Sequence, residues 1–329
     1  MSRRTLALWG ALFALTALPL RASTYLFYIE LQGIAGYASR AGKIVFSSLN
    51  DGEAMQKPSL GFDFVKRFSG RTRDIAVLAI QARLAANPRG ETKIEPQVYN
   101  AYVRFKARSA DFWIGHNRPK FGLASYLDSH ALLLQPLAMS GFGFDRDWGV
   151  GLEHDSAKGN VGLSLTTGTG MPLRFKGNYF IAGRVARGIL EQDNATAGIS
   201  VGYGKLSDTM GTRVLSDMLT GFAMAAVDIT WLRNNWENRL ELAGGRRGDL
   251  GAFALMWRTG LGLLDENRLK LEAQPVLVVE HAAATARFSV GATYAADADW
   301  TFRAMVAYDS TTKDSRIIVQ IYYYKGLRF

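Results

Sequence analysis

Apolar and polar residues alternate in short segments that recur about every 18 to 20 residues along the chain. In residues 299–309, the aromatic and aliphatic side chains share one parity, and Arg303 falls on the other. In residues 96–107, Tyr99 shares the apolar parity and Arg104 falls on the other. Successive side chains of a β-strand point to opposite faces, so this alternation predicts strands with one apolar and one polar face.

The pattern predicts an all-β chain of about sixteen strands, each long enough to span a membrane with roughly 9–11 residues. The predicted strands are 25–38, 58–69, 73–85, 96–107, 110–118, 145–155, 160–168, 177–188, 195–205, 222–233, 235–245, 249–261, 267–280, 284–296, 299–309 and 314–329. Alternate connections are short, whereas three others are long, at 39–57, 119–144 and 206–221. This asymmetry and an even strand number are typical of bacterial outer-membrane barrels. Fourteen strands is the alternative count.

The last predicted strand gives a second indication of the fold. Its apolar side chains, such as Val319 and Ile321, oppose Arg316 and Gln320, and the strand ends on Phe329. A chain that ends in this way resembles the closing strand of bacterial outer-membrane β-barrels. A soluble β-sandwich would alternate too, but aromatic residues lie near many predicted strand ends, as membrane-interface girdles require. We therefore predict a transmembrane antiparallel up-and-down β-barrel.

The N-terminus predicts export. Arg3-Arg4 precedes an apolar stretch from Leu6 to Leu18, and Ala22 offers a small residue for cleavage. This is the pattern of a secretory signal peptide. A twin-arginine signal would export a folded protein, which does not suit a barrel. We expect a cleaved signal over 1–22 and one barrel domain over 23–329, located in the outer membrane of a Gram-negative bacterium.

Composition narrows the chemistry. The chain has no cysteine, which excludes disulfides, thiolate metal sites and covalent c-type haem. The four histidines show no metal-ligand spacing, so we expect neither a metal nor another cofactor. The net charge is +10, and +7 remains without the three arginines of the signal peptide. A basic lumen would attract anions because a narrow pore focuses the field; a solvated basic surface is the alternative. Nucleic acid is not an expected partner of an exported barrel.

If the polar parity faces the lumen, the pore wall is rich in basic residues. Parity places Arg83, Arg104, Arg184, Arg239, Arg258, Lys270 and Arg303 on this wall. The third loop and its flanks add Arg118, Lys120 and Arg146 as candidate pore-lining and constriction residues. The acids expected on the same wall are Glu237, Glu241 and Glu272. Each arginine alone could belong to a salt-bridge network of the wall, but together they favour anion preference.

The connection 119–144 is too apolar for a loop that extends into water, because it holds Leu132-Leu133-Leu134 and Leu137. Folding back into the barrel would bury this surface and narrow the channel, with Asp128 and His130 at a constriction of mixed charge. Packing over the barrel mouth, or against a partner, is the alternative.

Three segments resemble, in the same order, segments of the phosphate-selective (polyphosphate-selective) porin family. They are Gly115-His-Asn-Arg-Pro-Lys-Phe-Gly-Leu123, Arg146-Asp-Trp-Gly-Val-Gly-Leu152 and Phe180-Ile-Ala-Gly-Arg-Val-Ala186. The resemblance covers the middle third of the chain and implies a sixteen-stranded, trimeric porin whose third loop narrows the pore. It places Arg118, Arg146 and Arg184 at motif positions. The third loop itself offers chiefly Lys120, which favours general anion or small-solute passage over phosphate specificity.

Outer-membrane enzymes are the main rival class. A barrel phospholipase needs a serine and a histidine on one wall, and neither Ser164 nor Ser200 has an evident histidine partner. A barrel protease needs an acid–histidine dyad, but the neighbours in Glu153-His154-Asp155 point to opposite faces. The sequence therefore favours a non-enzymatic porin for passive diffusion of small, anionic hydrophilic solutes, embedded in outer-membrane lipid and able to form a homotrimer. The alternative is a structural sheath around a partner, such as a multihaem cytochrome in an electron conduit.

Overall fold

The computed structural model describes residues 22–46, 55–87, 93–280 and 283–327. The predicted signal peptide, apart from its last residue, and the terminal Phe329 lie outside these residues. Within the described ranges, no helix is long and apolar enough to cross a membrane.

The chain is built almost entirely of β-strands. They are β1 (Ala22–Ala38), β2 (Lys43–Val45), β3 (Ser59–Ser69), β4 (Asp74–Ala86), β5 (Ile94–Lys106), β6 (Asp111–Asn117), β7 (Asp147–Ser156), β8 (Gly159–Thr166), β9 (Tyr179–Arg187), β10 (Ala195–Met210), β11 (Arg213–Arg233), β12 (Trp236–Arg247), β13 (Leu250–Leu263), β14 (Leu269–Glu280), β15 (Ala283–Ala295), β16 (Trp300–Asp309) and β17 (Asp314–Leu327). The described helices are α2 (Leu190–Asp193) and single 3-10 turns at Leu123–Ser125, Leu137–Ser140 and Asp265–Asn267.

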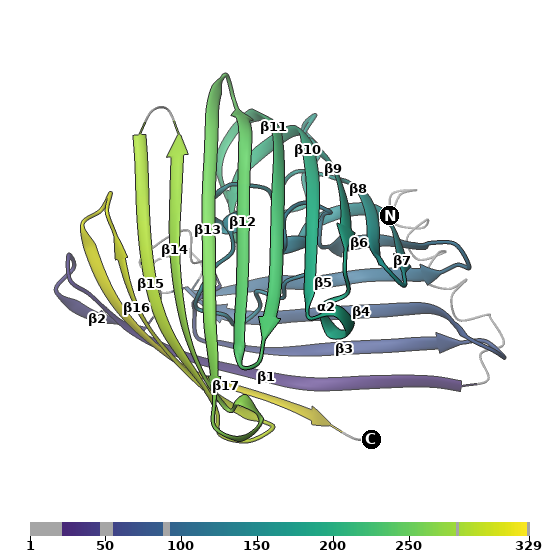
Figure 1. The fold of residues 1–329 in the computed structure, drawn as a ribbon, viewed down its shortest axis with the longest axis horizontal. Coiled ribbons are helices and arrows are strands. Elements are labelled where there is room, and N and C mark those ends of the chain that lie inside the picture. Colours follow the sequence, from purple (N-terminus) through teal and green to yellow (C-terminus); the bar gives the residue numbers. More distant parts are fainter. Residues whose placement is uncertain (1–21, 47–54, 88–92, 281–282, 328–329) are drawn as a thin grey trace.

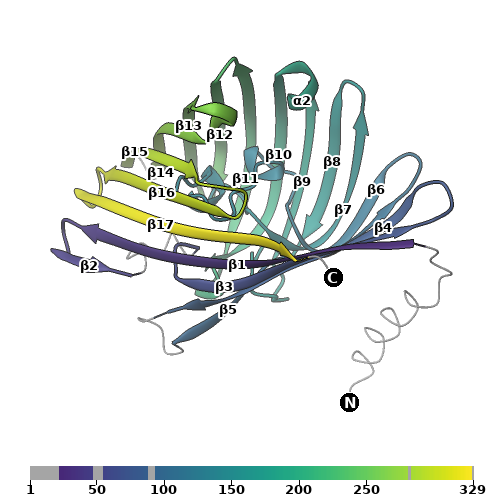
Figure 2. The ribbon, with the colours of Figure 1, turned by 90° about the horizontal axis from the view of Figure 1, so that it is seen from below.

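Sixteen of these strands close into an antiparallel barrel. From β3 to β17 each strand pairs with its neighbour along the chain, and β1 pairs with both β3 and β17. Figure 2 shows β17 beside β1, where the register places Phe27 opposite Leu327. The remaining strand, β2, is a three-residue strand that pairs with the end of β1. The predicted barrel of sixteen strands is confirmed; only β2, which does not span the sheet, was not predicted.

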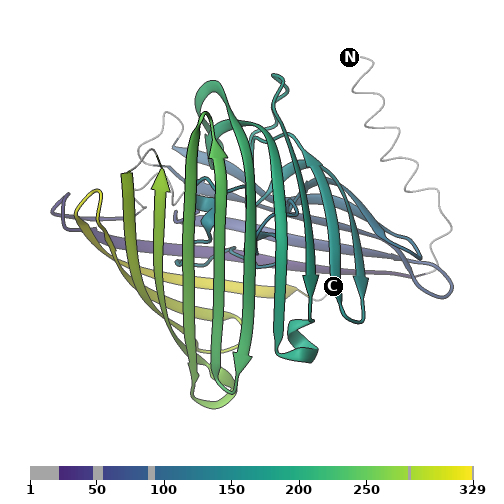
Figure 3. The same ribbon diagram turned by 45° about the horizontal axis from the view of Figure 1, so that its top comes forward.

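The two sides of the barrel differ in appearance. In Figure 1, β10 to β13 stand upright as a tall wall, and β1 and β3 to β5 cross at a steep angle to them. Figure 3 shows the same crossing, with the purple and blue strands running behind the green ones. Closing a sheet into a barrel requires such tilted strands.

The two ends of the barrel differ in the length of the connections between strands. The end with only short connections, such as 70–73, 157–158 and 234–235, is called the turn end, and the opposite one is called the loop end. One predicted loop is wrong. Residues 206–221 are mostly strand, because β10 continues to Met210 and β11 begins at Arg213. The hairpin continues through register shifts around Asp208, which disrupt the alternation that a regular strand would show.

The two faces of the wall follow the predicted parities. On β10, Ile199 and Val201 are exposed while Ser200 between them is buried. On β17, Val319 is exposed and Gln320 is buried. An apolar outer face suits the hydrocarbon of a membrane, and a polar inner face suits a lumen.

Tyr99 is an exception to this agreement. The sequence pattern placed it on the apolar, outward parity, but it is only 1% exposed and contacts inner residues. The cause is an extra residue in β5: Gln81 pairs with Asn100 while Ala82 pairs with Val98, which leaves Tyr99 without a ladder partner. Such a bulge changes which face a side chain takes.

Candidate functional site

The connection between β6 and β7, here called the 118–146 segment, packs against an apolar patch on the inner face of the wall. The wall residues of this apolar patch are Phe180, Ala182, Leu206, Phe222, Met224, Ala226, Ala243, Ala252, Ala254, Met256 and Val276. The segment contributes Phe121, Leu123, Leu137 and Phe142 to the same cluster. The rings of Phe121 and Phe222 meet edge to face at 5.8 Å between centroids. A second cluster joins Leu133 and Leu134 to Ile34, Met305, Ala307 and Ile318 of β1, β16 and β17.

Backbone groups of the segment are held by side chains of three strands. The amide of Lys120 donates to Ser164 Oγ on β8 at 3.0 Å, and the amide of Gly122 donates to Ser200 Oγ on β10 at 2.9 Å. The amide of Leu123 donates to Glu241 Oε1 on β12 at 3.0 Å. These buried acceptors satisfy amides that no regular secondary structure pairs.

The other half of the segment is held in the same way. The carbonyl of Leu134 accepts a hydrogen bond from Arg258 of β13 at 2.8 Å, and the carbonyl of Gln135 accepts one from Gln274 of β14 at 3.0 Å. His130 Nε2 lies 2.6 Å from Glu30 Oε2 on β1, and Glu30 is only 1% exposed. The segment therefore contacts inward-facing residues around most of the ring.

At the centre of the segment, one carboxylate joins two guanidinium groups. Asp128 Oδ1 lies 3.1 Å from Arg118 and 3.4 Å from Arg146, and Arg146 also pairs with Asp145 at 3.1 Å. Desolvation inside the barrel raises the pKa of Asp128, but the Arg118 and Arg146 guanidinium groups outweigh it and hold that pKa below its ordinary value. The Asp128 side chain is 62% exposed, so it presents its charge to the water of the lumen. The Arg146 guanidinium also stacks over the Tyr99 ring at 4.2 Å.

A second charge cluster lies next to it. Glu153 of β7 pairs with Lys120 and, at 3.3 Å, with Arg104 of β5. Burial lowers the pKa of Lys120, and the Glu153 carboxylate opposes that effect. Arg104 was predicted from parity and Lys120 from its place in the third loop, whereas the shared Glu153 carboxylate was not expected in this role.

Three cavities adjoin the segment. The loop-end cavity, of about 270 Å³, includes Met139, Arg146 and Arg247 in its lining. The middle cavity, of about 400 Å³, is lined on its charged side by Arg104, Arg118, Lys120, Arg184, Asp63, Asp128, Glu153 and Asp155. The turn-end cavity, of about 650 Å³, shares Asp128 and Arg184 with the middle cavity. The middle and turn-end cavities therefore adjoin, with the segment between them and the loop-end cavity.

The predicted basic residues separate into different environments. Arg104, Arg118, Lys120 and Arg184 line the middle cavity, Arg239 the turn-end cavity and Arg146 the loop-end cavity. Arg83 and Arg258 are 4% and 3% exposed and line none of these three. Arg303 donates to Gln320 at 2.9 Å and lies over Tyr322.

Most of these basic residues have an acidic partner. Arg184 pairs with the fully buried Asp228 at 2.6 Å, Arg83 lies 3.7 Å from Glu30, and Arg239 pairs with Glu237. Among the described residues, no carboxylate lies within ion-pair distance of Arg258 or Arg303. The basic surplus expected on the inner wall is therefore largely neutralised, in part because Glu30 and Asp228 come from strands that are distant in the chain.

The residues weighed as catalytic candidates have structural contacts instead. Ser164 and Ser200 accept the amides of the 118–146 segment. Glu153 is engaged by Lys120, while the adjacent His154 contacts the carbonyl of Ser109 in a turn. These contacts assemble no nucleophile and base.

Sequence reasoning missed the buried acids that organise the site. Asp147, at the start of β7, accepts hydrogen bonds from the amides of Gly168, Thr169 and Gly170 and from the Thr167 hydroxyl. It thereby shapes the connection after β8. The only available signal was its place directly after Arg146 in the resemblance motif.

No protein-family model matches the chain, and no curated protein matches its sequence. Its structure, however, is similar to solved outer-membrane porins. It is similar to the anion-selective porin from Comamonas acidovorans, with a TM-score of 0.66 and 10% identity over 92% of this chain and 100% of that one. It is also similar to OmpF of Salmonella typhi in complex with daunomycin, with a TM-score of 0.68 and 12% identity over 92% and 97% of the two chains. The trimer form of OmpT, an outer membrane protein of Vibrio cholerae, gives a TM-score of 0.67 and 12% identity over 92% and 100%.

At these identities the likeness shows the fold, which is that of the porin barrels. It does not distinguish the phosphate-selective family from other porins, so that resemblance stays a prediction.

Proposed function

We propose that this chain is an outer-membrane porin for passive diffusion of small hydrophilic solutes, with the 118–146 segment folded into the barrel as its constriction. One observation carries the proposal. A closed barrel with an apolar outer face holds an internal segment bonded to its inner wall, with cavities lined by charged residues on both sides of that segment. Water-filled space with charged walls suits solute passage better than a packed core does.

The proposed location is the outer membrane of a Gram-negative bacterium, reached through the secretory pathway with residues 1–22 as signal peptide. The porin-like fold supports it. A homotrimer embedded in outer-membrane lipid is also proposed, and the solved trimer of the similar Vibrio protein supports that assembly.

The anion preference that we propose is smaller than the net charge of the chain suggests. The middle cavity is lined by four basic residues and four acidic ones. Guanidinium groups stay charged at every working pH, whereas carboxylates are neutralised in acid. At neutral pH the anion preference therefore depends on the basic surplus of the whole chain and should be small, and it should grow as the pH falls. Arg104, Arg118, Lys120, Arg146, Arg184 and Arg239 would act at the pore, and Arg83, Arg258 and Arg303 would mainly support the wall.

The test is the reversal potential of the refolded protein in a planar bilayer under a KCl gradient, at pH 7 and at pH 3. An anion-directed reversal that grows on acidification supports the proposal. Arg118→Gln should reduce it, because this guanidinium lines the middle cavity, and Arg268→Gln, at an exposed turn, should not. Cation preference at both pH values would refute the charge argument and leave the pore intact.

The rival function is a sheath around a partner protein. The apolar patch of the inner wall is covered by the chain's own segment, which leaves that surface no need of a partner. A well-folded barrel that never conducts would reverse this preference.

A further inference from the structure

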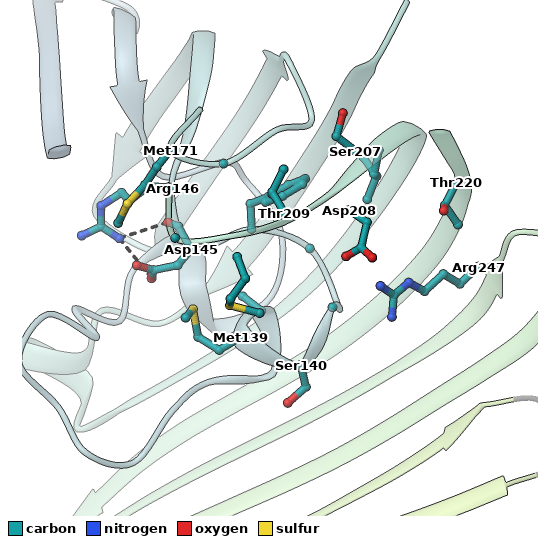
Figure 4. A pocket seen from close by; sticks show the side chains of 18 of the residues that line it. Met139, Ser140, Asp145, Arg146, Met171, Ser207, Asp208, Thr209, Thr220 and Arg247 are labelled. Carbon is teal, nitrogen blue, oxygen red and sulfur yellow. Dashed lines mark hydrogen bonds and ion pairs between the residues drawn. The ribbon is translucent and has the colours of Figure 1, made fainter. Parts of the chain in front are cut away.

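We propose that the loop-end cavity is a binding site for small zwitterions that carry an apolar side chain, on the scale of one amino acid or a dipeptide. The inference rests on the proposed pore function and deepens it, since the site would hold such a solute just before it passes the 118–146 segment. The cavity has a volume of about 270 Å³ and contains charged and apolar surfaces (Figure 4).

One wall of the cavity depends on an irregularity of β10. The ladder with β11 shifts on both sides of Asp208, so that Ser207 lies opposite Leu219 but Asp208 lies opposite Ser216. Residues 206–211 all line the cavity, although a regular strand would turn every second side chain away. A bulge of this kind re-aims side chains, and it occurs often beside functional sites.

Four charged residues line the cavity: Asp145 and Arg146 pair with each other, whereas Asp208 and Arg247 do not. Figure 4 shows the Asp208 carboxylate and the Arg247 guanidinium facing one another without an ion pair. Within the described ranges, no donor or cation engages the Asp208 carboxylate, whereas Arg247 bonds Glu280 through one nitrogen at 3.0 Å. A guanidinium has five donors, so Arg247 retains free ones.

A ligand with both an ammonium and a carboxylate would satisfy Asp208 and Arg247 together. Asp208 would repel an anion, and Arg247 would repel a cation. A zwitterion avoids both repulsions because it places an opposite charge at each residue. The separation of the two charges therefore selects the class of ligand as well as its orientation.

The remaining surface of the cavity is apolar and adaptable. Four of the chain's nine methionines line it, together with aromatic and aliphatic side chains: Met55, Met139, Met171, Met210, Tyr99, Phe144 and Leu206. Methionine is flexible and polarizable, and it packs against apolar groups of varied shape. This surface suits the side chain of a zwitterion and gives no comparable contact to glycine.

The walls are fixed before a ligand arrives. Trp148 Nε1 donates to the Met171 carbonyl at 2.7 Å, and the Thr209 hydroxyl donates to the Thr169 carbonyl at 2.9 Å. These bonds join the connection after β8 to β7 and β10. A preformed site loses less free energy in ordering when it binds.

The experiment measures binding by the full refolded chain with four probes: L-phenylalanine, 2-phenylethylamine, 3-phenylpropionate and glycine. Calorimetry in detergent gives affinities, and blockade of the single-channel current in a bilayer gives the site's position along the pore. L-phenylalanine should bind at least about tenfold more tightly than each of the other three, the scale of one charge-assisted hydrogen bond. Asp208→Asn and Arg247→Gln should each weaken it about tenfold, and Arg247→Lys should restore part of the affinity.

Two matched controls lie on neighbouring exposed positions outside the cavity lining, Arg246→Gln and Asp249→Asn, and both should bind as the unaltered chain does. Equal affinity for the four probes, or unchanged affinity in Asp208→Asn and Arg247→Gln, would overturn the site. The pore function is tested separately. A chain that binds L-phenylalanine but never conducts would support the binding site and contradict passive diffusion. A chain that conducts but does not bind L-phenylalanine would support the pore and contradict the binding site.

Discussion

Two parts of the inner wall hold the 118–146 segment by different physics. The apolar patch on β9 to β14 packs against its phenylalanine and leucine side chains. The wall of β1 and β7 contacts the segment through charged pairs, His130 with Glu30 and Lys120 with Glu153. Apolar packing is non-directional, so it sets where the segment rests. Ion pairs are directional and charged, so they set its orientation and the electrostatics of the passage.

Buried and exposed contacts of the segment should control different properties, stability and ion selectivity respectively. Truncating a buried aromatic side chain removes both transfer free energy and packing. Breaking a buried ion pair leaves an uncompensated charge, whereas an exposed pair contributes little. Substitutions at the buried contacts should therefore change folding, and substitutions at Asp128 should change ion flow.

The largest expected effect comes from the charged wall. Glu30→Ala should lower the free energy of unfolding by roughly 3–5 kcal/mol, because it leaves Arg83 as a buried charge and removes the partner of His130. Urea unfolding in lipid vesicles, followed by tryptophan fluorescence, measures the change. Glu191→Ala, at an exposed position of α2, is the control and should stay within about 0.5 kcal/mol. A comparable loss in both variants would show that the contacts of Glu30 do not specifically stabilise the barrel.

A similar or slightly smaller loss is expected at the apolar patch. Phe121 is 2% exposed and meets Phe180 and Phe222 edge to face. Phe121→Ala should cost about 3 kcal/mol of unfolding free energy and raise the single-channel conductance, because the segment loses its main packing contact. Phe175, which is 78% exposed, provides the matched control, Phe175→Ala. Unchanged conductance in a destabilised Phe121→Ala barrel would show that the patch does not position the segment.

A glycine tests the junction between the two kinds of contact. Gly122 has φ 60°, and an added Cβ would collide with the Glu241 carboxylate that accepts the Leu123 amide. Gly122→Ala should cost about 1–3 kcal/mol and increase conductance by displacing the segment from β12. Gly177 also has a positive φ, of 83°, but open space around its Cβ. Gly177→Ala should therefore show the backbone cost alone, with normal conductance; equal conductance in the two variants would contradict the displacement.

The smallest effect concerns selectivity. Asp128→Asn should shift the reversal potential towards anions at pH 7, because it removes an exposed negative charge between Arg118 and Arg146. The pKa of Asp128 lies below its ordinary value of about 3.9, so its ion pairs contribute above that pH and are lost as the pH falls through the folded-state pKa. The difference from the unaltered chain should accordingly persist at pH 5 and disappear only below about pH 3.9. Asp265→Asn, at an exposed turn, should leave the potential unchanged.

The strands were predictable because their signal is local. Alternation within about ten residues located each of the sixteen barrel strands and the inward face of residues such as Arg258 and Gln320. It failed where the ladder is irregular, at Tyr99 and at residues 206–221, because a bulge depends on the neighbouring strand. The alternation therefore predicted the regular wall better than its irregular places.

The site was only partly predictable. Parity identified Arg104 and Arg184 as inward, and the apolar composition of 119–144 indicated a buried loop. Parity did not show that Phe180 and Phe222 also point inward, beneath that loop, because apolar residues were assigned to the lipid side. Nor did it identify Glu30 as the partner of His130.

By itself, the sequence determined the strands, their two faces and the surplus of basic residues. Only the closed barrel decided which charges meet. Arg184 and Asp228 are 44 residues apart in the chain, and His130 and Glu30 are 100 apart, yet each pair is in contact. Alternation is a property of neighbouring residues, whereas electrostatic pairing depends on distances across the lumen, and those distances exist only once β17 has joined β1.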